Sequence, residues 1–258
     1  MSRRGGPRRS ALAAHALGSP QFLRVQLING FELRLGERHI ALPLSAGRVV
    51  AFLAFQRTGQ SRAFVAGTLW PDTSDTRAAA NLRSALWRLR QVSRPLVEAT
   101  GDRLQISHGV EVDFFELEAV IRRIHDHRTE PAALDVERLA SPADLLPGWY
   151  EDWVVFERER LRQLRLHSLD VLSDRLVERG RFALAVEAAL AAVREEPLRE
   201  SSHRSLIRAH LAEGNVSEAI REYRGFRQLL SDELGVKPSR EMEGLLHSVE
   251  ELSETALS

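Results

Sequence analysis

The chain has 258 residues, and its 36 Lys and Arg are balanced by 36 Asp and Glu, so the formal net charge is zero. With 43% hydrophobic and 28% charged residues, the composition is that of a globular protein and excludes collagen-like, disordered and membrane-embedded classes. The sequence contains 0 cysteines, which excludes disulfides, thiolate catalysis and cysteine-ligated zinc. At about 150 residues per domain, the length predicts one or two domains.

The zero net charge conceals an asymmetry along the chain. Up to Val110 there are 16 arginines and 6 acidic residues, a balance of +10, and the remainder therefore carries −10. This asymmetry predicts a basic module that binds a polyanion, followed by an acidic module. Residues 1–20 are basic but lack the apolar core of an export signal, and we interpret them as a disordered basic tail.

Residues 21–113 have the pattern of a small α+β module. Alternating apolar residues over 22–44, the last run being 39–44, predict short antiparallel strands. Three helices are expected next, beginning after an N-cap at Ser45, after Ser61, and near Thr76. The third is expected to end at about Val92. A hairpin over 96–106 and a strand at 110–112 then complete the layout of a winged helix-turn-helix domain.

From residue 114 to 258 the pattern is helical only, beginning with a 3.6-residue period over 114–124. A less regular connector, marked by prolines between 131 and 147, follows this first helical segment. Helices are expected near 149–178, 182–195, 200–213 and 216–232. A shift of 34 residues aligns Gly180 with Gly214 and Ala185 with Ala219. This period, with a tight glycine turn and a small residue entering each second helix, is typical of tetratricopeptide hairpins. The predicted fold is therefore a winged helix followed by an all-α tetratricopeptide-like domain.

The third predicted helix has two different faces. At 100° per residue, one face collects the apolar side chains Ala78, Leu82, Ala85, Leu86 and Leu89. The other side carries Arg77, Ser84, Trp87 and Arg88, flanked by Arg83 and Arg90. Residues 77–94, which also include Arg94, contain five arginines and no acid, whereas a solvated helix usually mixes charges for i,i+4 pairing. Contact with DNA is favoured over a merely solvated face, because arginine supplies both phosphate charge and guanine contacts.

Two residues of this module have alternative interpretations. Trp87 either faces outward on the third helix or folds back to pack at the edge of the domain. Arg103 follows the hairpin turn, from which a wing can reach the minor groove, but it is equally well explained as an ordinary exposed arginine.

The sequence offers no constellation for catalysis. The nine histidines lack metal-ligand spacing, and phosphate-loop, Rossmann-glycine and nucleophile-elbow patterns are absent from the sequence. We therefore expect no metal, no cofactor and no enzymatic activity. No run approaches the roughly 18 apolar residues of a membrane helix, so a cytoplasmic protein, associated with the nucleoid when bound to DNA, is expected.

Several segments together resemble a known family. Residues 25–113, with Leu69–Trp70 and Asn81–Arg90, look like the OmpR/PhoB-type winged helix. Leu146–Tyr150, the 34-residue repeats and Asp232–Ser239 resemble the bacterial transcriptional activator domain. In this order, the two modules resemble the Streptomyces antibiotic regulatory protein family over about 90% of the chain.

The resemblance implies a function and a division of roles. Residues 21–113 would be the DNA-binding domain and 114–258 the activator domain of a pathway-specific activator of secondary-metabolite genes. The helix around Asn81–Arg90 would read tandem direct repeats upstream of promoters, as a homodimer on double-stranded DNA. The loop after Pro71, with Asp72, Thr73, Ser74 and Asp75, would contact RNA polymerase holoenzyme. The alternatives are a repressor or architectural DNA-binding protein, and a helical peptide-binding adaptor.

Overall fold

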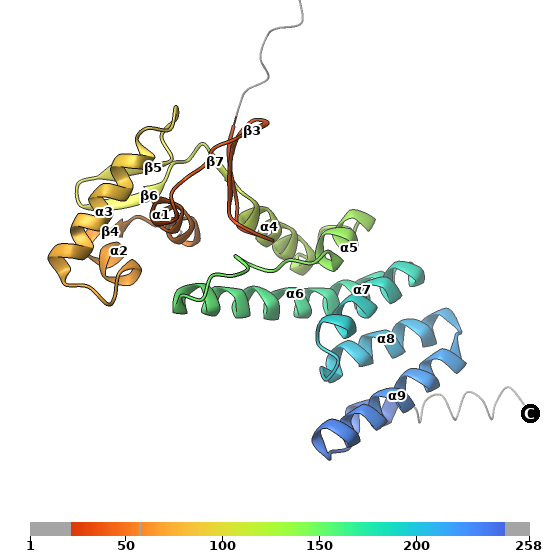
Figure 1. Ribbon diagram of the computed structural model, residues 1–258. Coiled ribbons are helices and arrows are strands. Elements are labelled where there is room, and N and C mark those ends of the chain that lie inside the picture. The colour runs from red at the N-terminus through yellow and green to blue at the C-terminus, as the bar shows by residue number, and fades with distance from the viewer. Residues whose placement is uncertain (1–21, 57, 246–258) are drawn as a thin grey trace, which may run out of the picture. The chain divides into compact units, whose positions relative to one another are not determined.

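A computed structural model describes residues 22–56 and 58–245, and within them the chain forms two compact units (Figure 1). Unit 1 comprises the described residues of 22–26 and 31–112, and unit 2 comprises 27–30 and 113–245. The predicted basic tail, residues 1–20, lies outside the described residues. A β-containing unit followed by a helical one confirms the predicted fold class.

Unit 1 begins with a four-stranded sheet. Its strands are β1 (Leu23–Gln26), β2 (Glu32–Leu35), β3 (Arg38–His39) and β7 (Val110–Val112), in the order β3-β2-β1-β7. β1 pairs antiparallel with β2 and parallel with β7, where Val25 faces Val112 in the register. The expected strand over 39–44 is wrong, because Arg38–His39 alone pair with β2 and the chain then enters a helix.

Three helices follow the sheet: α1 (Leu44–Phe55), α2 (Arg62–Leu69) and α3 (Asp75–Leu89). The N-cap expected at Ser45 is wrong. Pro43, whose fixed φ suits a helix start, occupies that position, and its carbonyl accepts from the amides of Ala46 and Gly47. The predicted helix start after Ser61 is confirmed, and Ser61 caps the helix, since its hydroxyl accepts from the amide of Phe64 at 3.2 Å.

The predicted hairpin is confirmed as β5 (Val97–Thr100) and β6 (Arg103–Ile106), which turn at Gly101 with φ +62°. β6 also pairs with the short strand β4 (Gln60–Ser61), which precedes α2. Three helices and this hairpin form the winged helix. α3 ends at Leu89, three residues before the end expected at Val92, because Arg90 caps it.

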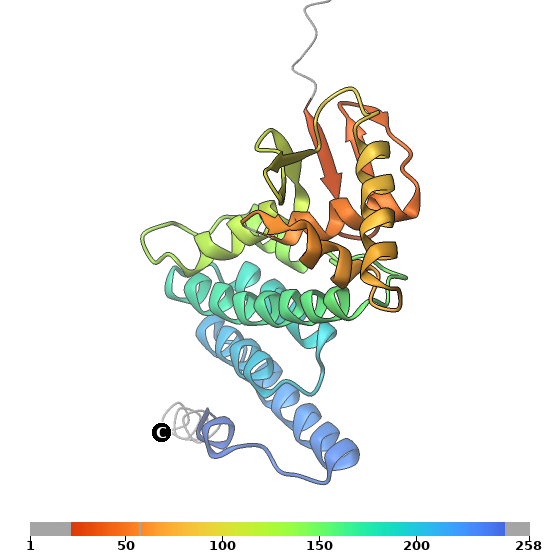
Figure 2. The ribbon, with the colours of Figure 1, turned by 90° about the vertical axis from the view of Figure 1, so that its left-hand side faces the viewer.

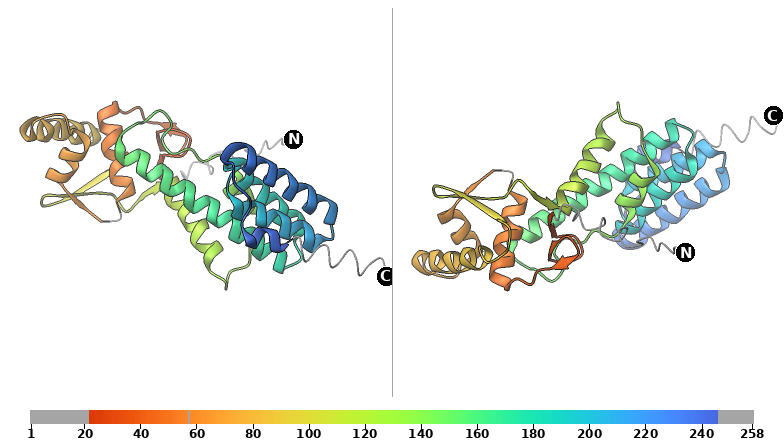
Figure 3. Two further views of the ribbon diagram at one scale, coloured as in Figure 1. Left: turned by 90° about the horizontal axis from the view of Figure 1, so that it is seen from below. Right: turned by 90° about the horizontal axis from the view of Figure 1, so that it is seen from above.

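Unit 2 consists of helices, and those after α6 stack as successive hairpins (Figures 1 and 2). They are α4 (Asp113–His125), α5 (Ala133–Ala140), α6 (Asp152–Glu178), α7 (Phe182–Glu195), α8 (Glu200–Glu213) and α9 (Val216–Leu234). The predicted 34-residue repeat is confirmed: Gly180 and Gly214 adopt φ of +68° and +90°, which glycine tolerates best. Ala185 and Ala219 are fully buried. Figure 3 shows the last helices of this unit lying side by side.

The prediction of an irregular connector before α6 is wrong in part, because this connector contains the helix α5. The side chains of Val136 and Leu139 are buried on one side of this helix. At the start of the helix, the Asp135 carboxylate accepts a hydrogen bond from the backbone amide of Ala132. Eight residues between prolines are too few to display a clear helical period in the sequence.

Residues 27–30 connect β1 to β2 and yet belong to unit 2. The Asp113 carboxylate accepts hydrogen bonds from the amides of Leu27 at 2.9 Å and Ile28 at 3.0 Å. Asn29 donates its amide to the carbonyl of Asp144 at 2.7 Å. Hydrogen bonds thus tie this short connection to the segment that follows α5.

Burial lowers the pKa of the His125 imidazole at the end of α4, and the charges of His167, Arg175 and His127 lower it further. The unfolded chain therefore holds this proton more tightly than the folded chain. Consequently, the free energy of unfolding falls as pH drops through the ordinary value of 6.5, and levels off below the folded-state pKa. We expect H125Q to reduce this loss between about pH 7.5 and about pH 5.5, measured by urea unfolding. H39Q, at an exposed position, should keep the wild-type slope, and an unchanged slope in H125Q would contradict the assignment.

Candidate nucleic-acid interface

α3 is built as an amphipathic helix with one face in the core of unit 1. Asp75 lies in its first turn, where a carboxylate interacts favourably with the positive end of the helix dipole. The predicted core face is confirmed, and its buried residues are Ala78, Leu82, Ala85, Leu86 and Leu89. Burial of this face determines which side chains point outward.

The outward side of α3 and the turn after it expose a row of polar and cationic side chains. The exposed residues are Arg77, Arg83, Ser84, Trp87, Arg88, Arg90 and Arg94, whereas Asn81 is half-buried. Trp87 is 62% exposed, so the alternative in which it folds back against the domain is wrong. A tryptophan this exposed on a cationic face offers apolar contact area to a binding partner.

The arginines on this surface form no ion pair with a described acidic residue, although Asp75 lies in the first turn of the same helix. No ion pair within residues 22–56 and 58–245 involves Arg77, Arg83, Arg88, Arg90 or Arg94. Arginines of unit 2 behave differently: Arg165 pairs with Glu195 at 2.9 Å, and Arg204 pairs with Glu241 at 2.8 Å. The arginines of α3 are therefore not ion-paired to described residues, whereas many arginines of the helical unit are paired in place.

A concave surface of about 610 Å³ runs along this face of α3. Its lining includes Arg83, Ser84, Trp87 and Arg88 from α3, together with Arg62 from the start of α2. Arg62 and Arg90 also line a neighbouring cavity of about 280 Å³ that reaches the hairpin at Val97. Sequence reasoning missed Arg62, since nothing in its local pattern places it beside Arg83 and Arg88, more than 20 residues along the chain.

Arg103, at the start of β6, is held by the chain rather than projecting freely. Its Nε and Nη2 atoms both donate to the carbonyl oxygen of Gly59, at 2.9 and 2.6 Å. This contact fixes the hairpin turn against the segment before β4. The Arg103 side chain nevertheless stays exposed.

The loop before α3 presents its acids outward. Asp72, Ser74 and Asp75 are exposed, and Thr73 is half-buried. The Thr73 hydroxyl donates to the carbonyl of Trp70 at 3.1 Å, and the hydroxyls of Ser74 and Thr76 lie 3.2 Å apart. These local bonds give the loop a defined shape while leaving both carboxylates accessible.

Metal-binding clusters and membrane-spanning helices are both absent from the described residues. No group of three or more His, Asp or Glu side chains there could hold a metal ion. None of the described helices has the length and apolar character needed to cross a bilayer.

Comparison with known proteins identifies the second half of the chain. Residues 120–250 match the family model of the bacterial transcriptional activator domain. The chain is 30% identical over 220 residues to "Regulatory protein AfsR" of Streptomyces griseus, covering 76% of this chain and 22% of the relative. It is 28% identical over 210 residues to the protein of that name from Streptomyces coelicolor, covering 73% of this chain and 20% of the relative. The chain thus spans about a fifth of the length of these curated relatives.

The fold also has a counterpart among solved structures. EmbR of Mycobacterium tuberculosis, solved in complex with a low-affinity phosphopeptide, superposes with a TM-score of 0.73 at 17% sequence identity. The match covers 90% of this chain and 66% of that one. At this identity the likeness shows a common fold, in which a β-containing unit precedes a helical one. The resemblance to the Streptomyces antibiotic regulatory protein family is confirmed by these matches taken together.

Proposed function

This chain belongs to the family of the bacterial transcriptional activator domain, and from that premise we propose that it activates transcription by binding double-stranded DNA through α3. The observation that carries the proposal is the row of exposed arginines on α3, none of them ion-paired to a described residue. Residues 21–113 form the DNA-binding domain in this proposal, and residues 114–258 form the activator domain. The proposed target genes are those of a secondary-metabolite pathway, as the resemblance to the Streptomyces antibiotic regulatory protein family implies; the relatives themselves are named as regulatory proteins.

In the proposed complex α3 enters the major groove, whose width accepts one helix. Arginines at its rim neutralise phosphates, and Arg83 or Arg88 donates two hydrogen bonds to a guanine edge. Trp87 supplies apolar contact, and Arg103 holds the hairpin in the orientation that a wing needs. Binding as a homodimer to tandem direct repeats would place two such helices on one promoter.

Salt dependence tests the proposal directly. If about six phosphates are neutralised, the logarithm of the association constant falls against the logarithm of salt concentration with a slope near −5. Fluorescence anisotropy with a labelled fragment of the regulated promoter measures this slope, and a scrambled duplex gives the non-specific baseline. A slope near zero, or equal affinity for both duplexes, would rule out sequence-specific DNA binding through this surface.

The loop over Pro71–Asp75 is proposed to contact RNA polymerase holoenzyme. Its two exposed carboxylates lie at the start of α3, where they would repel DNA phosphates but suit a basic protein surface. We expect D72A/D75A to retain DNA affinity within about twofold, while run-off transcription with purified polymerase falls by roughly tenfold. Unchanged transcription would contradict the polymerase contact. Wild-type protein that lowers transcription in the same assay would instead identify a repressor.

A further inference from the structure

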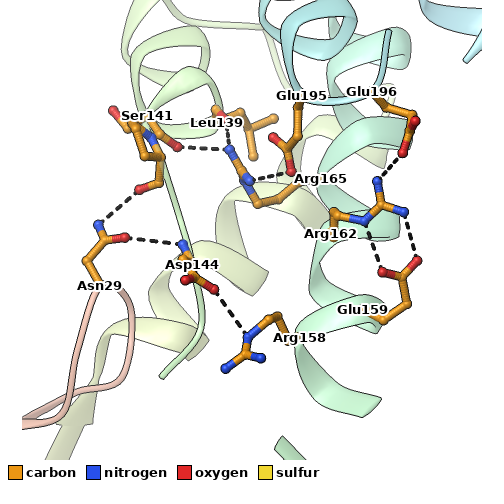
Figure 4. Close-up of polar contacts among 11 residues, drawn as sticks. Asn29, Leu139, Ser141, Asp144, Arg158, Glu159, Arg162, Arg165, Glu195 and Glu196 are labelled. Atoms are coloured by element: carbon orange, nitrogen blue, oxygen red, sulfur yellow. Dashed lines mark hydrogen bonds and ion pairs between the residues drawn. The ribbon is translucent and has the colours of Figure 1, made fainter. Parts of the chain in front are cut away.

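A cavity in unit 2 has four arginines in its walls, although this unit lies in the acidic part of the chain. Figure 4 shows three of them, Arg158, Arg162 and Arg165, with their polar partners. Its volume is about 500 Å³, and it lies between the segment after α5, the first half of α6 and the last turn of α7. The charged wall residues are Arg158, Arg162, Arg165, Arg194, Asp144 and Glu195. Cations therefore outnumber carboxylates there by four to two.

Helix geometry and hydrogen bonds fix these guanidinium groups in place. Arg158, Arg162 and Arg165 follow at i, i+4 and i+7 on α6, which brings them to one face of the helix. Arg165 is buried and donates to the carbonyls of Leu139 at 2.7 Å and Ser141 at 2.8 Å. Arg158 donates to three carbonyls between residues 145 and 149. Two of the cations are thus preorganised by the backbone around them.

The internal ion pairs leave one arginine of the wall without a carboxylate partner among the described residues. Arg165 binds Glu195, Arg158 lies 3.2 Å from Asp144, and Arg162 bonds to the carboxylates of Glu159 and Glu196 outside the wall. Arg194 is exposed and forms no ion pair with a described residue. In addition, the Nε atom of Arg165 is buried without a hydrogen-bond partner in the described part of the chain. A wall with an unmatched guanidinium attracts an anion.

The remaining wall is small and apolar. It is made by Ala140, Pro142 and Ala143 from the segment after α5 and by Ala191 from α7. Short side chains at these positions leave the cavity open and give it a surface suited to an aliphatic or aromatic body. Binding cavities for small molecules combine such apolar walls with a few fixed polar groups.

We propose that this cavity binds a small organic carboxylate, with its charge at Arg194 and its apolar body against the 140–143 segment. The same segment is bonded to Asn29, whose side-chain amide donates to Pro142 at 3.0 Å and accepts from the amide of Asp144 at 3.2 Å. A ligand in the cavity would therefore contact a segment that is hydrogen-bonded to residues 27–30, the connection between β1 and β2. The proposed binding site lies within unit 2, so its test is independent of the test of DNA binding.

The test uses the full chain without DNA, and 2-naphthoate as the probe. Isothermal titration calorimetry should show binding of 2-naphthoate, but neither of its uncharged analogue 2-naphthamide nor of inorganic phosphate, which lacks an apolar body. R194Q should weaken binding by roughly tenfold, the effect of about one charge-assisted hydrogen bond. R227Q, which removes an exposed arginine from α9 away from the cavity, is the matched control and should bind as the wild type does.

A second variant tests the apolar wall. Ala143 is half-buried in the cavity wall, and A143F places a phenyl ring there that fills the cavity. This variant should abolish binding while the circular dichroism spectrum stays unchanged. In amide NMR spectra of the wild-type chain, shifts caused by 2-naphthoate should include the side-chain amide of Asn29. Absence of binding, equal binding of 2-naphthamide or of phosphate, or equal affinity of R194Q and wild type would each overturn the proposal.

Discussion

The R83A/R88A double variant is expected to bind promoter DNA at least about thirtyfold more weakly than the wild type, a loss of about 2 kcal/mol or more. Each of the two arginines loses a base or phosphate contact worth about 1–3 kcal/mol. Both side chains are exposed and without an ion pair to a described residue, so their removal leaves the buried face of α3 intact. Thermal unfolding should consequently be unchanged within a few degrees.

The matched control for this experiment is R224A/R227A, which removes the same charge from exposed positions on α9 in unit 2. Its DNA affinity should stay within about threefold of the wild type, since the proposal assigns the DNA contacts to unit 1 and neither arginine belongs to that unit. The single variants then separate the two kinds of contact. An arginine that reads a base loses affinity unequally across sequence variants, whereas one that binds phosphate lowers the salt slope by about 1 on every sequence. Equal losses in R83A/R88A and R224A/R227A would refute the role of α3.

The R165A variant is expected to lower the free energy of unfolding of the helical unit by about 3–5 kcal/mol. The buried guanidinium of Arg165 neutralises Glu195 and satisfies the carbonyls of Leu139 and Ser141. Removing it leaves one partly buried carboxylate unpaired and two carbonyls without this donor. Urea unfolding followed by circular dichroism at 222 nm, a wavelength that reports helix content, measures the change.

Arg194, on α7 in the same cavity, provides the control. Because it is exposed and has no ion pair among the described residues, R194A should change the free energy of unfolding by no more than about 0.5 kcal/mol. A loss below about 1 kcal/mol in R165A would mean that water replaces the lost hydrogen bonds, and that Arg165 does not join α5 to α7.

Much of the fold followed from periodicity in the sequence. The 3.6-residue period separated the apolar face of α3 from its arginines, and all five residues assigned to the core are buried. Likewise, the 34-residue shift placed Gly180 and Gly214 at helix ends, where their positive φ values are found. These features are local, because each depends on residues within one or two turns of a helix or on a repeated unit.

The charge asymmetry and the arginine-rich, acid-free stretch over 77–94 were also readable from sequence alone, since a count requires no contacts. Only the tertiary structure decided which arginines are already paired. It joins Arg103 to Gly59, 44 residues earlier, places Arg62 beside α3, and gathers Arg158, Arg165 and Arg194 around one cavity. It also assigns residues 27–30 to the second unit. Such contacts depend on which chain segments meet in space, and sequence period carries no information about partners that lie dozens of residues apart.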